Sequence, residues 1–352
     1  KLHGMPGDAP LLATDRRHYE RVMAANAEAF CPRVRPGDIV VLNDPQTLGL
    51  AESLRRSGAA VVWRNHIGAD GDNEHTGQGW AFLHPYLASV DLCVFSRREY
   101  APHPLASPFV VMAPTIDPLS AKNCDLDSAG GDGAILAACG LGGVPEQAPL
   151  VVQVSRWDPL KDPVGVIEGF TRLDLDRLGV HLALVGPDTA EVADDPEGRE
   201  VFEDCRRRWQ ALQESQRRRI HLVSLPMADV EENARMVSAI QRRATIVVQK
   251  SLAEGFGLTV TEAMWKQKPV VASAVGGIQD QIVHGEHGWL LADPTHPDEF
   301  AAALDRLLRD RTVAATLATN ARRRVHDRFL DDRQLCAWGQ TFERLARGRR
   351  AA

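Results

Sequence analysis

The sequence of 352 residues predicts a doubly wound α/β protein made of two halves, each with a parallel sheet. Short apolar runs rich in β-branched residues alternate with helical patterns, which is typical of parallel strands covered by helices. The length is sufficient for two domains of ordinary size. Between residues 117 and 149 the chain is rich in Gly, Asp, Ser and Pro, as expected of a linker between the halves.

The first domain is expected over residues 1–118. Its buried strands are expected at 39–42, 60–63, 92–96 and 109–112. Its helices are expected at about 15–24, 47–57 and from Gly79 to about 88. The amphipathic tail over 333–347 predicts one more helix, and we expect residues 330–352 to pack back on this domain.

A linker over 119–148, with one short helix near 132–140, is expected to lead into a second domain over 149–329. The strands of this domain are expected at 150–154, 181–186, 220–223, 245–248, 269–272 and 288–291. Its helices are expected from 164, at 199–216, 261–266, after 278, at 297–309 and at 312–326.

Composition excludes several classes of protein. Apolar residues make up 44% and charged residues 25%, as in globular domains, and the net charge of −6 argues against a nucleic-acid partner. The sequence has no apolar run of the roughly 18 residues that span a bilayer, so no membrane partner is expected. The six cysteines are scattered without a C-x-x-C pair, which argues against a disulfide framework or a cysteine metal site and favours a cytoplasmic location.

The stretch most suggestive of chemistry runs from Ser251 to Met264. Glu254 and Glu262 stand eight positions apart, and Gly255-Phe256-Gly257 follows the first of them. An expected strand precedes the stretch, so Glu254 falls on a strand-to-helix loop and Glu262 about one turn into the helix. A helix N-terminus favours an anionic ligand, and glycines allow that ligand close to the backbone. The alternative is a capped helix with two solvated acids.

Two further loops could bind an anion. Arg156 and Lys161 stand five apart just after a strand, where open α/β sheets bind ligands, and two cations there could neutralise a diphosphate. Gly276 and Gly277 lie between a strand and a helix, where backbone N–H groups can meet a phosphate or a sugar. The alternatives are an exposed basic pair and an ordinary tight turn. His66 also follows a strand, although a lone histidine is more often structural.

The segment E-G-F-G-L-T-V-T-E-A-M, from Glu254 to Met264, resembles the E-x7-E motif of retaining glycosyltransferases of family 4, which have the GT-B fold. The segments 114–123, 248–251 and 276–278 resemble the trehalose glycosyltransferring synthases within that family. The resemblance covers nearly the whole chain and is densest over 245–291. It implies two Rossmann-like domains that face each other across a cleft.

The resemblance implies roles on the donor, a nucleoside diphosphate glucose. The Arg-x4-Lys pair, Arg156 and Lys161, would hold the diphosphate, Glu254 the sugar hydroxyls and Glu262 the ribose. Further donor contacts are expected from the two glycine loops, at Gly255, Phe256, Gly257, Leu258, Gly276 and Gly277. We expect no metal site and no obligatory cofactor, although Mg²⁺ could accompany the nucleotide.

The resemblance also implies roles in the first domain. His66, in Arg64-Asn65-His66-Ile67, would lie near the anomeric carbon and act with Arg156, Lys161 and Glu254 as the catalytic set. Asp44 and Gln46 would bind the acceptor. Asn43 stands where these relatives usually have His, so the identity of the acceptor stays open.

The family's first domain begins with a strand and a Gly-rich loop that closes on the donor phosphates. The sequence opens past that point, which leaves open a fragment of a longer protein or a separate N-terminal piece. A homodimer is also compatible with this class.

We therefore expect a retaining glucosyltransferase that forms trehalose from a nucleoside diphosphate glucose and glucose. One alternative is another retaining family 4 glucosyltransferase, which forms sucrose or a glycosyl phosphate. A second alternative is a non-catalytic remnant that binds a nucleotide sugar. A nicotinamide dehydrogenase is disfavoured because no G-x-G-x-x-G follows a strand.

Overall fold

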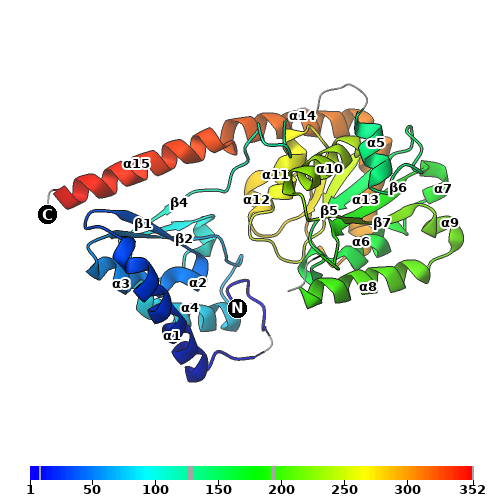
Figure 1. Ribbon diagram of the computed structural model, residues 1–352. Helices are drawn as coiled ribbons and strands as arrows, with labels where there is room; N and C mark the ends of the chain where they lie inside the picture. Colours follow the sequence, from blue (N-terminus) through cyan, green and yellow to red (C-terminus); the bar gives the residue numbers. More distant parts are fainter. Residues whose placement is uncertain (8, 125–130, 192–194, 351–352) are drawn as a thin grey trace. The chain divides into compact units, whose positions relative to one another are not determined.

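The computed structural model describes residues 1–7, 9–124, 131–191 and 195–350, and the chain divides into two compact units (Figure 1). Unit 1 comprises residues 1–114 together with 332–352, and unit 2 comprises residues 115–331. Each unit has its own parallel sheet and its own apolar core. None of the helices in the described ranges is long and apolar enough to cross a membrane.

Unit 1 holds a four-stranded parallel sheet, and the four strands expected from the sequence are confirmed. They lie side by side in chain order as β1 (Ile39–Asn43), β2 (Ala60–Asn65), β3 (Leu92–Phe95) and β4 (Phe109–Val111). The register pairs Val41 with Val62 and Val62 with Leu92. Because the strands are parallel, the residues that follow β1 and β2 meet at one edge of the sheet.

Helices cover both faces of this sheet. One face carries Trp63 and packs against α1 (Ala13–Phe30), α3 (Ala51–Arg56) and α4 (Glu74–Leu87). The neighbouring residue Val62 points to the opposite face, as alternation along a strand requires, and packs there with Trp338 of α15 (Asp331–Arg350). The C-terminal helix therefore belongs to the core of the first unit.

The helix expected over 47–57 is wrong in its bounds, because two helices occupy this stretch. They are α2 (Asp44–Leu48) and α3, and they are separated at Gly49. The Tyr19 hydroxyl donates to Pro45 O at 2.8 Å and accepts the Gly49 N–H at 2.7 Å, so α1 fixes the break. Helix α4 also starts earlier than the expected Gly79, because the Asn73 side chain accepts N–H groups of its first turn.

Unit 2 holds a six-stranded parallel sheet in the order β10-β9-β8-β5-β6-β7. All six expected strands are present, as β5 (Leu150–Val154), β6 (His181–Pro187), β7 (Ile220–Leu225), β8 (Ile246–Gln249), β9 (Val270–Ser273) and β10 (Trp289–Leu291). The doubly wound α/β class is thereby confirmed for both units. In the linker expected at 119–148, residues 125–130 lie outside the described residues, and the short helix there is α5 (Gly131–Ala138).

Helix α10 (Val230–Arg243), which lies between β7 and β8, was not expected from the sequence. The sequence contained two signals for this helix. Asp229 is an N-cap that accepts the N–H groups of Glu231 and Glu232. Val237 and Ile240 form an apolar side, which is buried. The other helices are α6 (Pro163–Phe170), α7 (Leu175–Leu178), α8 (Pro196–Gln210), α9 (Glu214–Arg217), α11 (Leu258–Trp265), α12 (Ile278–Gln281), α13 (Pro297–Arg309) and α14 (Arg311–Arg328).

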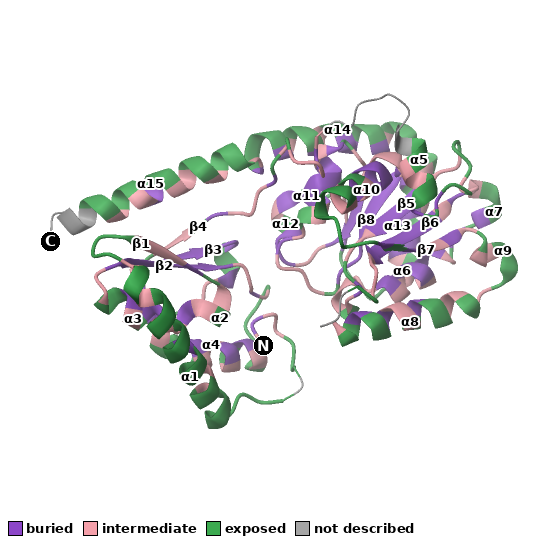
Figure 2. Cartoon of the chain, viewed as in Figure 1, coloured by how far each residue is buried: buried purple, intermediate pink, exposed green. Residues whose placement is uncertain are grey.

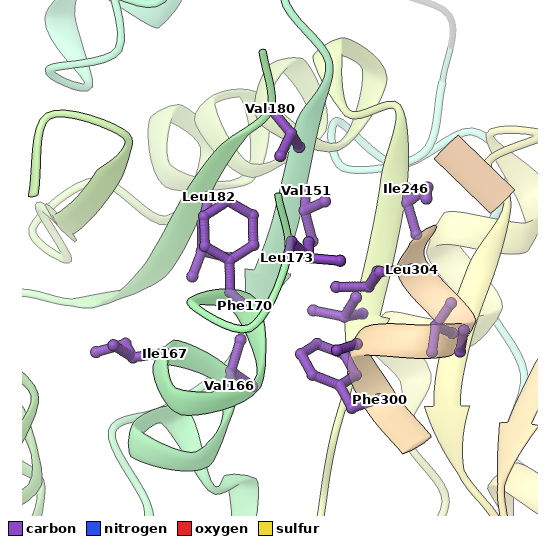
Figure 3. Packing of buried hydrophobic residues seen from close by; sticks show 14 of the residues in the cluster. Val151, Val166, Ile167, Phe170, Leu173, Val180, Leu182, Ile246, Phe300 and Leu304 are labelled. Atoms are coloured by element: carbon purple, nitrogen blue, oxygen red, sulfur yellow. The ribbon is translucent and has the colours of Figure 1, made fainter. Parts of the chain in front are cut away.

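Burial of the unit 2 sheet explains why its strands are continuous apolar runs in the sequence. Strands β5, β6 and β8 are buried along almost their whole length (Figure 2). On one face, side chains of α6 and α13 pack against the sheet, as Figure 3 shows for Phe170, Phe300 and Leu304 with Val151, Leu182 and Ile246. This rigid centre fixes the positions of the loops at the strand ends.

Candidate functional site

The ligand-binding residues expected in unit 2 meet at the carboxyl ends of neighbouring strands. Lys161 follows β5, Glu254 follows β8 and Gly277 follows β9, and these strands are adjacent in the sheet. The chain builds β5, β6 and β7 in one direction and then places β8 on the other side of β5. Open α/β sheets bind their ligands at such a reversal of strand order. The fold therefore brings distant loops to the edge where a ligand is expected.

Lys161 and Glu254 form an ion pair at this edge. Lys161 Nζ lies 2.7 Å from Glu254 Oε2, and the two side chains are only 16% and 11% exposed. The same carboxylate oxygen accepts the Ser251 hydroxyl at 3.2 Å and Gln249 Nε2–H at 3.4 Å. The carboxylate expected to orient sugar hydroxyls is thus held in place by its neighbours within unit 2.

A buried glutamine joins the two loops that carry this ion pair. Gln153, on β5, donates to Lys161 O at 2.9 Å and accepts the Lys250 N–H at 3.2 Å. The Lys250 ammonium is almost fully buried and pairs with the Asp162 carboxylate. Asp162 has φ of +46°, a left-handed conformation that costs free energy for a non-glycine residue and that its contacts must enforce. These contacts define the backbone around Lys161.

Arg156 lies on the same loop but has a different carboxylate partner. Its side chain is 68% exposed, and its guanidinium lies 2.7 Å from Asp158 Oδ2. The loop after β5 therefore carries one sequestered cation, Lys161, and one exposed cation, Arg156. An exposed guanidinium can change rotamer without disturbing the core, and it can bind a phosphate with two N–H groups.

The glycine loops after β8 and β9 contact one another. The Gly277 N–H donates to Gly255 O at 3.2 Å. A Cβ on Gly277 would lie 2.6 Å from the Phe256 ring, so this close approach requires glycine. Gly276 has φ of +49°, which also favours glycine. The two loops thus form one continuous backbone surface.

Around the start of α11, the expected donor-binding residues differ in exposure. Gly257 has φ of +84° and precedes the helix, and Leu258 is 41% exposed. Phe256 is buried and packs on Phe329 with ring centroids 5.8 Å apart. The side chain of Phe256 therefore supports the loop from inside the unit, and the backbone around it is what a ligand can approach.

Glu262 lies on α11 and is only 6% exposed. Its Oε1 lies 3.0 Å from Lys122 Nζ, and its Oε2 is buried without a hydrogen-bond partner among the described residues. A buried carboxylate oxygen without a donor costs free energy, so an unmet acceptor at an expected ligand site indicates where a hydroxyl could donate.

In unit 1, the structure joins two residues that the sequence predicted separately. His66 Nδ1 lies 3.2 Å from Asp44 Oδ1, and the His66 backbone N–H donates to the same oxygen at 2.8 Å. Arg64 Nε–H donates to His66 Nε2 at 3.0 Å. Because Nε2 accepts, the ring proton is assigned to Nδ1, where it can donate to Asp44. These contacts fix the orientation and the tautomer of the His66 ring.

The charges of this triad follow from burial and proximity. Burial lowers the pKa of Arg64 to about 10, and the Asp44 charge partly opposes that change. Burial pulls the pKa of Asp44 upward, but hydrogen bonds from His66 and the charges nearby hold the pKa below its usual range. Asp44 also has φ of +59°, so the loop after β1 keeps a strained residue in place, as functional loops often do.

Gln46, the other expected acceptor residue, is exposed on α2. It lines a hollow of about 400 Å³ together with Pro45, Ile67 and Phe82. Most of the lining is apolar, and Asp44 and His66 are not part of it. Gln46 is therefore near Asp44 in sequence, but the hollow that it lines is mostly apolar and does not include Asp44 or His66.

Sequence reasoning gave no role to Arg64, Lys122, Gln153 or Lys250, all of which contact or position the expected site residues. Arg64 and Lys250 lay inside recognised motifs. A signal for the lysines was their scarcity, since the chain has only six. Gln153 could have been noticed as a polar residue inside an apolar strand. Their contacts themselves depend on the tertiary structure.

Comparison with known protein families assigns most of the chain. The family model "Glycosyl transferases group 1" matches residues 142–324, and "Trehalose synthase, N-terminal domain" matches residues 1–102. The trehalose synthase of Rubrobacter xylanophilus is 36% identical over 331 residues, which cover 93% of this chain and 74% of that protein.

Solved structures support the same fold. An α,α-trehalose 6-phosphate synthase from Burkholderia multivorans aligns with a TM-score of 0.74 and 18% identity, over 97% of this chain and 77% of that chain. Anabaena Alr3699/HepE in complex with UDP-glucose aligns with a TM-score of 0.69 and 17% identity, over 93% of this chain and 82% of that chain. At these identities the likeness establishes the GT-B fold alone.

Proposed function

We propose that this chain, which belongs to the group 1 glycosyl transferases and, among them, to the trehalose synthases, transfers glucose from a nucleoside diphosphate glucose to free glucose with retention of configuration. The product is trehalose. The observation that carries the proposal is the Lys161–Glu254 ion pair at the reversal point of the unit 2 sheet.

The donor side of the proposal rests on the charges at this edge. Lys161 and Arg156 supply positive charge for a departing diphosphate, and Glu254 accepts hydrogen bonds from sugar hydroxyls. Glu262 binds the ribose through its unmet oxygen. Lys161 and Arg156 could neutralise the diphosphate in place of a metal ion. The proposal therefore includes no obligatory metal, and any Mg²⁺ would arrive with the nucleotide.

The acceptor side rests on the Asp44–His66 pair in unit 1. Asp44 is kept ionised and can accept a hydrogen bond from a hydroxyl of the incoming sugar, while His66 is held close to it. The Asn43 side chain is exposed beside Asp44, which makes it a residue able to select between acceptors. The acceptor is therefore the part of the proposal that most needs measurement.

The transfer itself needs few protein groups. The acceptor oxygen forms a bond to the anomeric carbon on the side of the leaving group, and the bond from that carbon to the diphosphate oxygen breaks. The acceptor proton passes to the departing diphosphate. Protein groups position the substrates and stabilise the charge that develops on both.

The proposal is tested by incubating the protein with labelled glucose and ADP-, UDP- or GDP-glucose, with Glu254→Gln as the control of strongly reduced activity. The expected product is α,α-trehalose, identified by the anomeric signals in its NMR spectrum. Glucosylation of fructose or of a sugar phosphate, but not of glucose, would replace the acceptor assignment and keep the class. Nucleotide-sugar binding without any transfer would indicate a binding protein instead.

A further inference from the structure

A short segment over residues 120–124 is fastened to α11, the helix that carries Glu262. Trp265 Nε1–H donates to Asn123 O at 3.2 Å, and Lys266 Nζ donates to Asn123 Oδ1 at 3.2 Å. The guanidinium of Arg242, at the end of α10, donates to Cys124 O. Side chains from the ends of two helices therefore hold this segment at Asn123 and Cys124.

The segment also has its own internal structure. Asn123 is buried, and its Nδ2 donates to Asp117 O at 3.0 Å and to Ser120 Oγ at 3.2 Å. The Asp117 carboxylate in turn accepts the Leu119 N–H at 2.8 Å. Lys122 thus projects from a backbone that is positioned before any ligand arrives.

The Lys122 ammonium is directed to one oxygen of the Glu262 carboxylate. Its Nζ lies 3.0 Å from Oε1, and its side chain is 40% exposed, whereas that of Glu262 is 6% exposed. The second oxygen, Oε2, is buried and has no donor among the described residues. Lys266, the other nearby lysine, reaches only the backbone carbonyl of Glu262, at 3.5 Å. The two carboxylate oxygens therefore differ: Oε1 has a cationic partner, and Oε2 has no hydrogen-bond donor among the described residues.

We propose that Lys122 is a positioning residue of the ribose site: it holds Glu262 through Oε1 and thereby presents Oε2 to a hydroxyl of the donor ribose. The inference rests on the proposed function, which assigns Glu262 to the ribose. Without the ammonium, Oε1 loses its charged partner and the carboxylate is free to turn, so Oε2 is no longer held toward the ribose. Lys122 therefore sets how strongly the protein distinguishes ribose from a sugar without hydroxyls.

The test compares ADP and UDP with their 2′,3′-dideoxy counterparts by calorimetry. The protein should prefer the ribose forms by roughly tenfold to a hundredfold, the value of hydrogen bonds to a charged acceptor. In Lys122→Met the preference should fall to a few-fold, because Oε2 is no longer held in place, while affinity for the dideoxy forms stays the same. Lys122→Arg keeps the charge and should keep most of the preference.

Two controls separate positioning from folding. Arg172→Met removes another half-exposed cation from an ion pair of unit 2, 2.6 Å from Asp298, and should leave both affinities unchanged. In a Glu262→Gln background, Lys122→Met should not lower the preference further, because the pair acts as one unit. Thermal melting of each variant verifies that it is folded.

The outcomes distinguish this inference from the proposed function. If Lys122→Met weakens ribose and dideoxy forms equally, or Lys122→Arg loses the preference, Lys122 only fastens the segment and the inference is overturned. If the unmodified protein binds nucleotides without any ribose preference, the inference also fails. If it binds no nucleoside diphosphate at all, the proposed function itself fails.

Discussion

Lys161 Nζ lies 2.7 Å from Glu254 Oε2, although 93 positions separate the two residues in the chain. The sequence assigned the lysine to a diphosphate and the carboxylate to a sugar. Since the two groups already pair, a sugar diphosphate that enters the site would contact both partners of one ion pair. The bond that breaks in such a donor joins its sugar to its diphosphate. The ion pair would lie beside that bond, with Glu254 on the sugar and Lys161 on the diphosphate.

Glu254→Gln is expected to lower kcat by about two orders of magnitude or more, the scale of one transition-state contact, and to keep nucleotide affinity. The contact to the transferred sugar tightens as charge develops at the anomeric carbon, whereas a bare nucleotide lacks that sugar. Steady-state kinetics together with calorimetry of ADP and UDP measure both effects. Unchanged kcat and KM would indicate that the stretch around Glu254 is only a capped helix and has no role in transfer.

Glu262→Gln is expected to raise the donor KM more than it lowers kcat. A ribose contact exists both before and during transfer, so its loss weakens ground state and transition state alike. Varying the donor concentration at saturating glucose gives the two parameters. A fall in kcat with constant KM would place Glu262 at the reacting sugar instead.

Gln153→Leu is expected to lower kcat because it releases both donor loops, and to cost about 1–3 kcal/mol in the free energy of unfolding, since two buried backbone groups lose their partner. Gln241→Leu is the matched control, because Gln241 is equally buried but its amide has no partner among the described residues. The control should be neutral or stabilising and fully active. Equal effects of the two substitutions would show that Gln153 has no special role.

His66 is expected to carry a ring proton on Nδ1, because Arg64 donates to its other nitrogen and Asp44 accepts from Nδ1. Nitrogen chemical shifts of ¹⁵N-histidine-labelled protein report the tautomer directly. In Arg64→Lys the guanidinium Nε–H that donates to Nε2 is lost, so the preference for one tautomer should weaken. A spectrum of the unmodified protein with the proton on Nε2 would contradict this assignment.

Lys266 is expected to make stability depend on alkaline pH. Burial lowers its pKa from 10.5 to about 7, an effect that nearby Glu262 partly opposes. The unfolded chain therefore binds more protons between about pH 7 and 10.5, so this contribution to the free energy of unfolding increases as pH rises through that window and is lost as pH falls back toward 7.

Urea denaturation at several pH values, compared between the unmodified protein and Lys266→Met, isolates this contribution. Lys268 has a pKa lowered to about 8 and adds a slope of the same sign in both proteins, so the difference between the two curves belongs to Lys266. A difference that does not change from pH 7 to 10 would contradict the expected titration.

Much of the fold could be predicted because its signals are local. The strands are apolar, β-branched runs, and each was found within a residue or two of its bounds. Helix bounds were less predictable where side chains from elsewhere decide them: α2 and α3 are divided at Gly49 because Tyr19 of α1 binds the backbone there. Helix α10 was missed although its cap and its apolar side were present in the sequence.

The site was predicted as a set of residue types and could not be predicted as a set of contacts. The sequence determined which loops carry acids, cations and glycines, because these are fixed by motif and spacing. Which groups pair depends on strand order, since β8 lies beside β5 while β6 and β7 lie on the other side. That order places Glu254 against Lys161 and Lys250 against Asp162, whereas the packing of residues 120–124 on α11 places Lys122 against Glu262. Ion pairs form between neighbours in space, which the order of residues along a chain does not specify.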